Sequence, residues 1–96
     1  MRLNTACLIA LVLICIFIQS TAAQSQCRII VNNGAAAGAY VEVLDGSQRV
    51  FWGPTDSNGV CYPDLVQGRS YTVIVKWNGR NSRTDIIAND PVNVSV

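Results

Sequence analysis

The stretch Thr55-Asp56-Ser57-Asn58-Gly59-Val60-Cys61-Tyr62-Pro63-Asp64-Leu65 decides how this chain folds. Asp and Asn side chains fold back onto their own backbone in turns, and the glycine tolerates a positive φ, so Asp56–Gly59 predicts a tight turn. After the turn, the period of two in a strand sends Val60 and Tyr62 to one side and Cys61 to the other. We therefore expect Cys61 to face inward on a strand that begins at a fixed turn.

Residues 1–23 have the three-part form of a secretory signal peptide. Arg2 supplies a positive charge, residues 7–18 are an apolar run, and Thr21-Ala22-Ala23 offers small residues for cleavage. The run is shorter than the roughly 20 residues that span a bilayer, which argues against the alternative, a transmembrane anchor. We expect cleavage after Ala23 and a secreted, extracellular product without membrane insertion. A single domain, residues 24–96, remains.

The charges of residues 24–96 are balanced. Arg2 lies in the leader, so six basic residues remain against six acidic ones, and the two signs are interspersed. Such a balance gives no argument for nucleic acid, an anionic membrane or a polyanionic substrate as the partner.

Two cysteines, Cys27 and Cys61, remain after the two in the leader are removed. In an oxidising compartment two cysteines most often pair with each other, so we predict a Cys27–Cys61 disulfide. The alternative is an intermolecular bridge through one free thiol. Closing a loop of about 35 residues stabilises a fold by roughly 4 kcal/mol. That is comparable with the whole net stability expected of so small a domain.

Short alternating segments separated by turn residues fill the rest of the chain. Asp45-Gly46 and Asn78-Gly79 are typical hairpin turns, and no segment shows a helical period. The predicted strands are residues 27–31, 39–44, 49–52, 60–65, 70–77, 82–87 and 92–96. This pattern predicts an all-β fold, a seven-stranded antiparallel immunoglobulin-like β-sandwich.

The order of these motifs resembles the carboxypeptidase regulatory-like, or prealbumin-like (transthyretin-like), sandwich domain. The motifs are Gly-Ala-x-Val-x-Val at residues 38–43, Thr-Asp-x-x-Gly-x at 55–60 and Gly-x-x-Tyr-x-Val-x-Val at 68–75. The resemblance covers nearly all of residues 27–96. It implies that Thr55–Gly59 is the characteristic turn, and it assigns five residues to the core: Val41, Val43, Tyr71, Val73 and Val75.

The chain departs from that family pattern at its two cysteines. Members of the family usually place a core aromatic at the position of Cys61, and no cysteine is expected at Cys27. The paired change supports a disulfide that replaces part of the core. It also suggests a small, free-standing, secreted version of the domain.

The sequence offers few residues that could act in catalysis. The chain has no histidine, which removes Ser-His and Cys-His catalysis and His-containing metal sites. Catalytic relatives of the resembled fold use histidine or tyrosine-rich sites. A calcium site from Asp56 and Asn58 is an alternative to turn capping, but it lacks further acidic ligands. We therefore predict no enzyme activity, no cofactor and no metal.

Two short motifs have both functional and structural interpretations. Asn93-Val94-Ser95 is an N-glycosylation sequon at an outward strand position, so Asn93 is a candidate glycosylation site. Asn78-Gly79-Arg80 resembles a short integrin- or peptidase-binding tripeptide, although Asn-Gly is also the commonest hairpin turn. We favour the turn.

Three large aromatic residues, Phe51, Trp52 and Trp77, are unusual for a domain this small. Phe51 and Trp52 are consecutive in a predicted strand, so at least one of them faces outward. Large rings provide contact area at a low entropic cost. We predict that one of this pair, joined by Trp77, contacts a partner.

These observations favour a secreted, monomeric, non-enzymatic binding module whose partner is another extracellular protein. A second hypothesis is a secreted host-defence or effector polypeptide, such as an immune-induced, venom or seminal product. A third is an oligomeric carrier of small molecules like transthyretin, which would need dimers or tetramers to form a channel.

Overall fold

The strongest alternating segment, Ser70–Trp77, forms strand β7 of a four-stranded antiparallel sheet. The computed structural model describes residues 23–96. The sheet order is β4-β3-β7-β8, with β3 at Tyr40–Asp45, β4 at Gln48–Pro54 and β8 at Arg80–Ile87. Asn78 and Gly79, with φ of 50° and 74°, connect β7 to β8, which confirms the predicted turn there.

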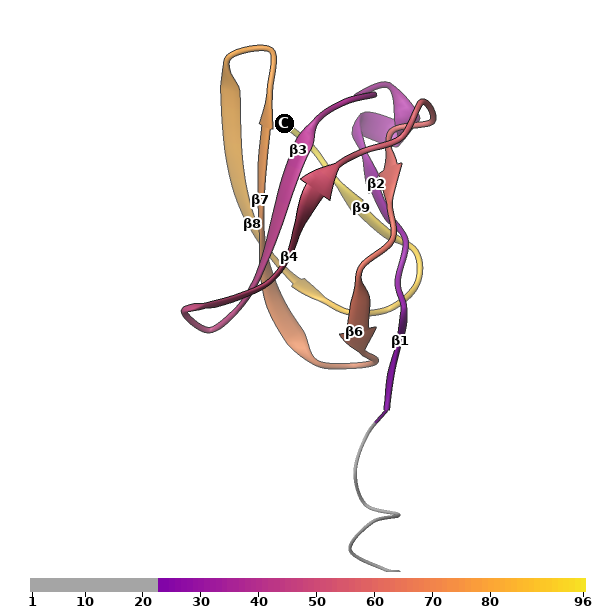
Figure 1. Ribbon diagram of the computed structural model, residues 1–96, viewed down its shortest axis with the longest axis vertical. Coiled ribbons are helices and arrows are strands. Elements are labelled where there is room, and N and C mark those ends of the chain that lie inside the picture. The colour runs from indigo at the N-terminus through magenta and orange to yellow at the C-terminus, as the bar shows by residue number, and fades with distance from the viewer. Residues whose placement is uncertain (1–22) are drawn as a thin grey trace, which may run out of the picture.

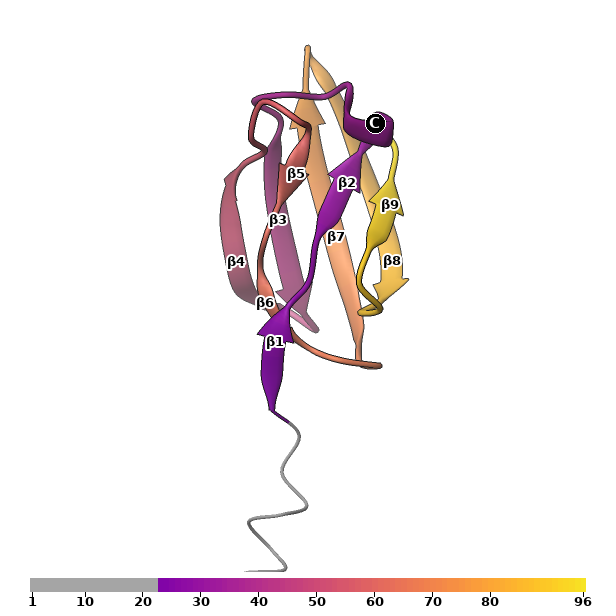
Figure 2. The same cartoon turned by 90° about the vertical axis from the view of Figure 1, so that its right-hand side faces the viewer.

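Three shorter strands form a second layer. The sheet order is β5-β2-β9, with β5 at Val60–Cys61, β2 at Ile29–Val31 and β9 at Val92–Val94. A two-stranded ribbon of β1 (Gln24–Gln26) and β6 (Asp64–Val66) extends this side of the molecule at one end. The two layers face each other (Figures 1 and 2).

The core lies between the two layers. The five core residues that the family resemblance implied, Val41, Val43, Tyr71, Val73 and Val75, are all buried. They meet buried side chains of the second layer: Cys27, Ile29, Val31, Cys61, Leu65, Val92 and Val94. The hydroxyl of Tyr71 accepts a hydrogen bond from the Val66 N–H at 2.9 Å, so its one polar atom is satisfied.

The predicted turn at Asp56–Gly59 is present and is held from several sides. The Asp56 carbonyl accepts a hydrogen bond from the Gly59 N–H at 3.0 Å, and Gly59 has a φ of 73°. The buried Thr55 hydroxyl accepts from the Ala39 N–H and donates to the Ala36 carbonyl, which ties the turn to the loop before β3. A Cβ on Gly59 would lie 2.7 Å from the Gly34 backbone, so this contact requires glycine.

The structure corrects the predicted strand count and direction. There are nine strands in residues 23–96, not seven, and β2 and β9 run parallel, so the fold is not purely antiparallel. The predicted strand at 60–65 is two strands, because β5 ends at Cys61 and Pro63 has no N–H to donate. Polar Gln24–Gln26 pairs with β6 although its sequence carries no apolar signal.

The predicted signal peptide, residues 1–23, lies outside the described residues except for Ala23. Within residues 23–96, no helix is long and apolar enough to cross a membrane. The only helical segment of this part of the chain is a 3₁₀ turn, η1, at Asn32–Gly34.

Cys27 and Cys61 are buried free thiols in the structure, so the predicted disulfide is not formed there. Cys27 donates its N–H to the Pro63 carbonyl at 2.8 Å, and Cys61 lies opposite Ile29. Cys27 lies in the segment between β1 and β2, and Cys61 is the last residue of β5.

Candidate interaction surface

The outward side of the four-stranded sheet carries the most exposed tryptophan. Trp52 is 57% exposed on β4, one of the two edge strands of this sheet. Phe51, its neighbour, points inward and packs half-buried against the core. Alternation along the strand thus sends the two rings to opposite sides, as the sequence required.

The residues beside Trp52 follow from strand register. Trp52 lies opposite Glu42, Glu42 lies opposite Ile74, and Ile74 lies opposite Arg83, so these four side chains form one row across the sheet. The next row is Pro54, Tyr40, Lys76 and Asn81. We call these two rows, with Arg49, the Trp52 face.

Arg49 and Glu42 position the tryptophan. The Arg49 guanidinium lies 4.4 Å from the centroid of the Trp52 ring, a cation–π distance. The same guanidinium is 3.9 Å from the Glu42 carboxylate. Trp52 is therefore exposed but held on one side, which lowers the entropy that it would lose on binding.

Trp77 does not join Trp52 on one continuous ring surface. It shares its inward parity with Tyr71, Val73 and Val75, and it is half-buried against the core at the end of β7. It also lines an open pocket of about 640 Å³ at the tip of the β7–β8 hairpin. Of the three predicted aromatic contacts, Trp52 is exposed, and Phe51 and Trp77 are both half-buried.

The outward side of the three-stranded sheet is different. We call it the Tyr62 face, and its residues are Arg28, Ile30, Val60, Tyr62 and Asn93. Tyr62 is 44% exposed. Asn93, the predicted glycosylation site, is exposed on β9, beside Ile30 of β2.

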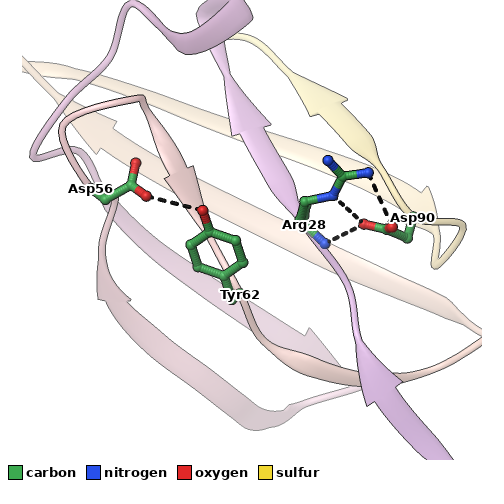
Figure 3. A network of polar contacts seen from close by, with 4 residues as sticks. All are labelled: Arg28, Asp56, Tyr62 and Asp90. Atoms are coloured by element: carbon green, nitrogen blue, oxygen red, sulfur yellow. Dashed lines mark hydrogen bonds and ion pairs between the residues drawn. The ribbon is translucent and has the colours of Figure 1, made fainter.

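Hydrogen bonds and an ion pair hold the polar groups of the Tyr62 face (Figure 3). The Tyr62 hydroxyl donates to Asp56 Oδ2 at 3.1 Å. Arg28 donates from its side chain to both carboxylate oxygens of Asp90, at 3.0 and 3.2 Å, and from its backbone N–H at 2.8 Å. These contacts are made within the chain and leave few polar groups free.

The pKa values of both carboxyl groups respond to these contacts. The Val60 N–H hydrogen bond, with smaller contributions from Asn58 and Tyr62, lowers the pKa of Asp56 below its ordinary value. The Arg28 side chain and backbone lower the pKa of Asp90. Hydrogen bonds to Asp56 raise the pKa of Tyr62.

The alternative calcium site at Asp56 and Asn58 does not gather enough ligands. Asp56 Oδ1 accepts hydrogen bonds from the Asn58 and Val60 N–H groups at 2.9 and 3.0 Å, as a turn cap does. Within residues 23–96, no group of three or more His, Cys, Asp or Glu side chains could hold a metal ion.

The two thiols are poor nucleophiles. Burial, followed by the nearby charges of Asp56 and Cys27, raises the pKa of Cys61 to about 12. Burial is also the largest cause that raises the pKa of Cys27. Because the thiolate is the reactive form, neither group is prepared for covalent catalysis.

Sequence reasoning missed several residues of the Trp52 face. Arg49 contacts the tryptophan ring, and Tyr40, Ile74 and Lys76 join the same face through cross-strand register, which becomes visible only when the strand pairs are known. The signal that could have found Tyr40 and Ile74 is their outward parity on predicted strands.

Comparison with known proteins does not assign a family. No protein-family model matches the chain. A search of the curated proteins likewise found no significant match.

Proposed function

We propose that residues 24–96 form a secreted, non-enzymatic interaction module that binds another extracellular protein through the Trp52 face. We further propose that the fold is a prealbumin-like β-sandwich and that the module acts as a monomer. Two facing layers around one core, with the central turn at Asp56–Gly59, support the fold proposal. The leader pattern of residues 1–23 supports secretion.

The exposure of Trp52 is the observation that carries the binding proposal. A ring that is 57% exposed leaves a large apolar area in water, and tryptophan is among the residues that contribute most energy at interfaces. Arg49 and Tyr40 lie on the same face, and Arg and Tyr are the other residue types enriched at such sites. An anchor held by Arg49 and surrounded by polar groups fits a protein contact.

The available chemistry favours binding over catalysis. The chain has no histidine, and burial keeps the Cys27 and Cys61 thiols protonated. Asp56 and Asp90 are occupied by hydrogen bonds within the chain. These groups have structural partners and no free geometry for acid, base or nucleophilic work.

Partner capture with and without Trp52 tests the proposal. The full chain is expressed through a secretory pathway, purified from the medium, immobilised and exposed to extracellular fluid from its source. We expect a specific protein, identified by mass spectrometry, on the wild type and its loss on Trp52→Ser at an unchanged melting temperature. Retention of the same partner by Trp52→Ser would overturn the proposal. Size determination checks the monomer.

A further inference from the structure

The basic residues without acidic partners are gathered in one place. Ion pairs in the described part of the chain engage Arg28 with Asp90, Arg49 with Glu42, and Arg69 with Asp45. The remaining basic residues of residues 24–96 are Lys76, Arg80 and Arg83. All three are exposed and lie on the β7–β8 hairpin. In a segment with balanced charge, this gathering creates a locally positive tip.

A pocket lies at the same tip. It has a volume of about 640 Å³, opens to solvent, and is contributed by the start of β3, the hairpin turn and the loop before β3. The residues that line it include Tyr40, Lys76, Trp77, Asn78, Arg80 and Asn81. None of them is acidic, and they include two cations, two amides, a phenol and an indole.

Two acidic groups of the same sheet have other partners. Glu42, in the adjacent row of the Trp52 face, is paired with Arg49 at 3.9 Å. Asp85, farther along β8, accepts a hydrogen bond from the Thr72 hydroxyl at 2.8 Å. The ammonium of Lys76 and the guanidinium of Arg80 therefore remain available to a carboxylate from outside.

We propose that this pocket binds a carboxylate of an acidic peptide segment in the protein partner. The inference rests on the proposed function and specifies the partner's chemistry. Tyr40 and Lys76 belong to the row next to Trp52, and alternate strand residues are about 7 Å apart. One peptide segment thus reaches the tryptophan with an apolar side chain and the pocket with an acidic one.

The number of cations favours an acidic peptide over a polyanionic chain. Highly charged polymers bind through the release of many counterions, which requires an extended row of basic residues. Here only three exposed basic residues lie on one hairpin, and two of them, Lys76 and Arg80, line the pocket. Two cations beside Tyr40 and Trp77 match one or two carboxylates with adjoining apolar contacts.

Calorimetric titration with an acetylated, amidated hexaglutamate peptide tests this inference. We expect measurable binding at low ionic strength, none with hexaglutamine, and a loss of about five- to tenfold in affinity for Lys76→Gln combined with Arg80→Gln. Arg69→Gln removes one positive charge elsewhere on the surface and is the control for charge as such, with an affinity within about twofold of the wild type. Equal losses from Arg69→Gln would overturn the inference, because they would show a general charge effect.

Fluorescence locates the peptide. The chain has two tryptophans, so Trp52→Phe leaves Trp77 as the only one, and Trp77 lines the pocket. We expect hexaglutamate to change the Trp77 emission with the same saturation point as the heat signal. Binding without any change in that emission would contradict the location. Tighter binding of a heparin oligosaccharide than of hexaglutamate would overturn the choice of an acidic peptide.

The two proposals fail separately. The titration uses no natural partner, so an absence of hexaglutamate binding rejects the acidic segment and leaves the Trp52 capture test untouched. If Trp52→Ser retains the partner while the Lys76 and Arg80 variants lose hexaglutamate, Trp52 is not the anchor and the pocket stands.

Discussion

The two outward faces of the molecule differ in how their polar groups are satisfied. On the Tyr62 face, Asp56 holds Tyr62 and the turn backbone, and Asp90 holds Arg28. On the Trp52 face, the large ring is exposed, and Lys76 and Arg83 have no acidic partner within residues 23–96. The polar groups of one face are engaged within the chain, and the other face presents an exposed ring beside cations without acidic partners.

This difference suggests that one face stabilises the fold and the other face binds the proposed partner. Contacts of the Tyr62 face and its turns hold the fold, so changes there should cost stability. Contacts of the Trp52 face lie outside the core, so changes there should cost binding.

The largest loss of stability is expected where the central turn meets η1. Gly59→Ala places a Cβ 2.7 Å from the Gly34 backbone at a φ of 73°. The conformational strain costs about 1–2 kcal/mol and the overpacking about 1–3 kcal/mol, so the free energy of unfolding should fall by roughly 2–5 kcal/mol. Denaturant unfolding measures the change.

Gly79→Ala is the matched control on the other sheet. Gly79 has nearly the same φ, 74°, but its Cβ would meet nothing within 4 Å. Only the conformational cost of about 1–2 kcal/mol should remain. Equal losses for the two variants would show that the contact with Gly34 does not constrain the turn.

A disulfide between Cys27 and Cys61 would stabilise the layer that carries the Tyr62 face. If Cys27 and Cys61 bond, as the sequence predicts, replacing both by Ala should lower the free energy of unfolding by about 2–4 kcal/mol. Intact mass with alkylation before and after reduction decides whether the bond exists. Uptake of two alkyl groups by the unreduced, unfolded monomer would agree with the free thiols of the structure and exclude the bond.

Low pH should remove the stability that the Asp56 and Asp90 carboxylates contribute at the Tyr62 face. The pKa values of Asp56 and Asp90 are lowered in the folded state, so the carboxylates stabilise the fold above the ordinary value of about 3.9. That stability is lost as the pH falls below this value through the lowered pKa values. The melting temperature should be nearly constant from neutral pH to about 5 and then fall.

The variant Asp56→Asn combined with Asp90→Asn identifies the groups responsible. It should melt lower than the wild type at neutral pH and show a smaller further decrease in acid. A decrease in acid as large as that of the wild type would place the titrating groups elsewhere.

The sequence predicted the interior better than the strand boundaries. Alternation placed Cys61 inward, because burial of one side of a strand leaves a period of two, and the family resemblance assigned Val73 and Val75 to the core; all three are buried. It missed β1, since Gln24–Gln26 pairs through its backbone and carries no apolar residue. The parallel pairing of β2 with β9 depends on contacts far apart in the chain, which local patterns do not encode.

The candidate surface was only partly predictable. The consecutive rings required one outward aromatic, and Trp52 is that residue. The cluster around it, including Arg49 and Tyr40, depends on register, and a bulge between Val43 and Leu44 shifts the pairing of Arg49. The pocket at the hairpin tip combines β3 with β7 and β8, so no single segment of sequence could indicate it.

Replacing one exposed ring on each face tests the binding proposal most directly. These replacements are also expected to change stability least. Trp52→Ser and Tyr62→Ser are compared for affinity to the captured partner, and each melting temperature is recorded. We predict that Trp52→Ser weakens binding by about 30-fold or more, as loss of an interface anchor does, while it changes stability by about 0.5 kcal/mol or less. Tyr62→Ser should bind within about twofold of the wild type. Retained binding by Trp52→Ser, with a loss of binding in Tyr62→Ser, would contradict the assignment of the Trp52 face as the binding surface.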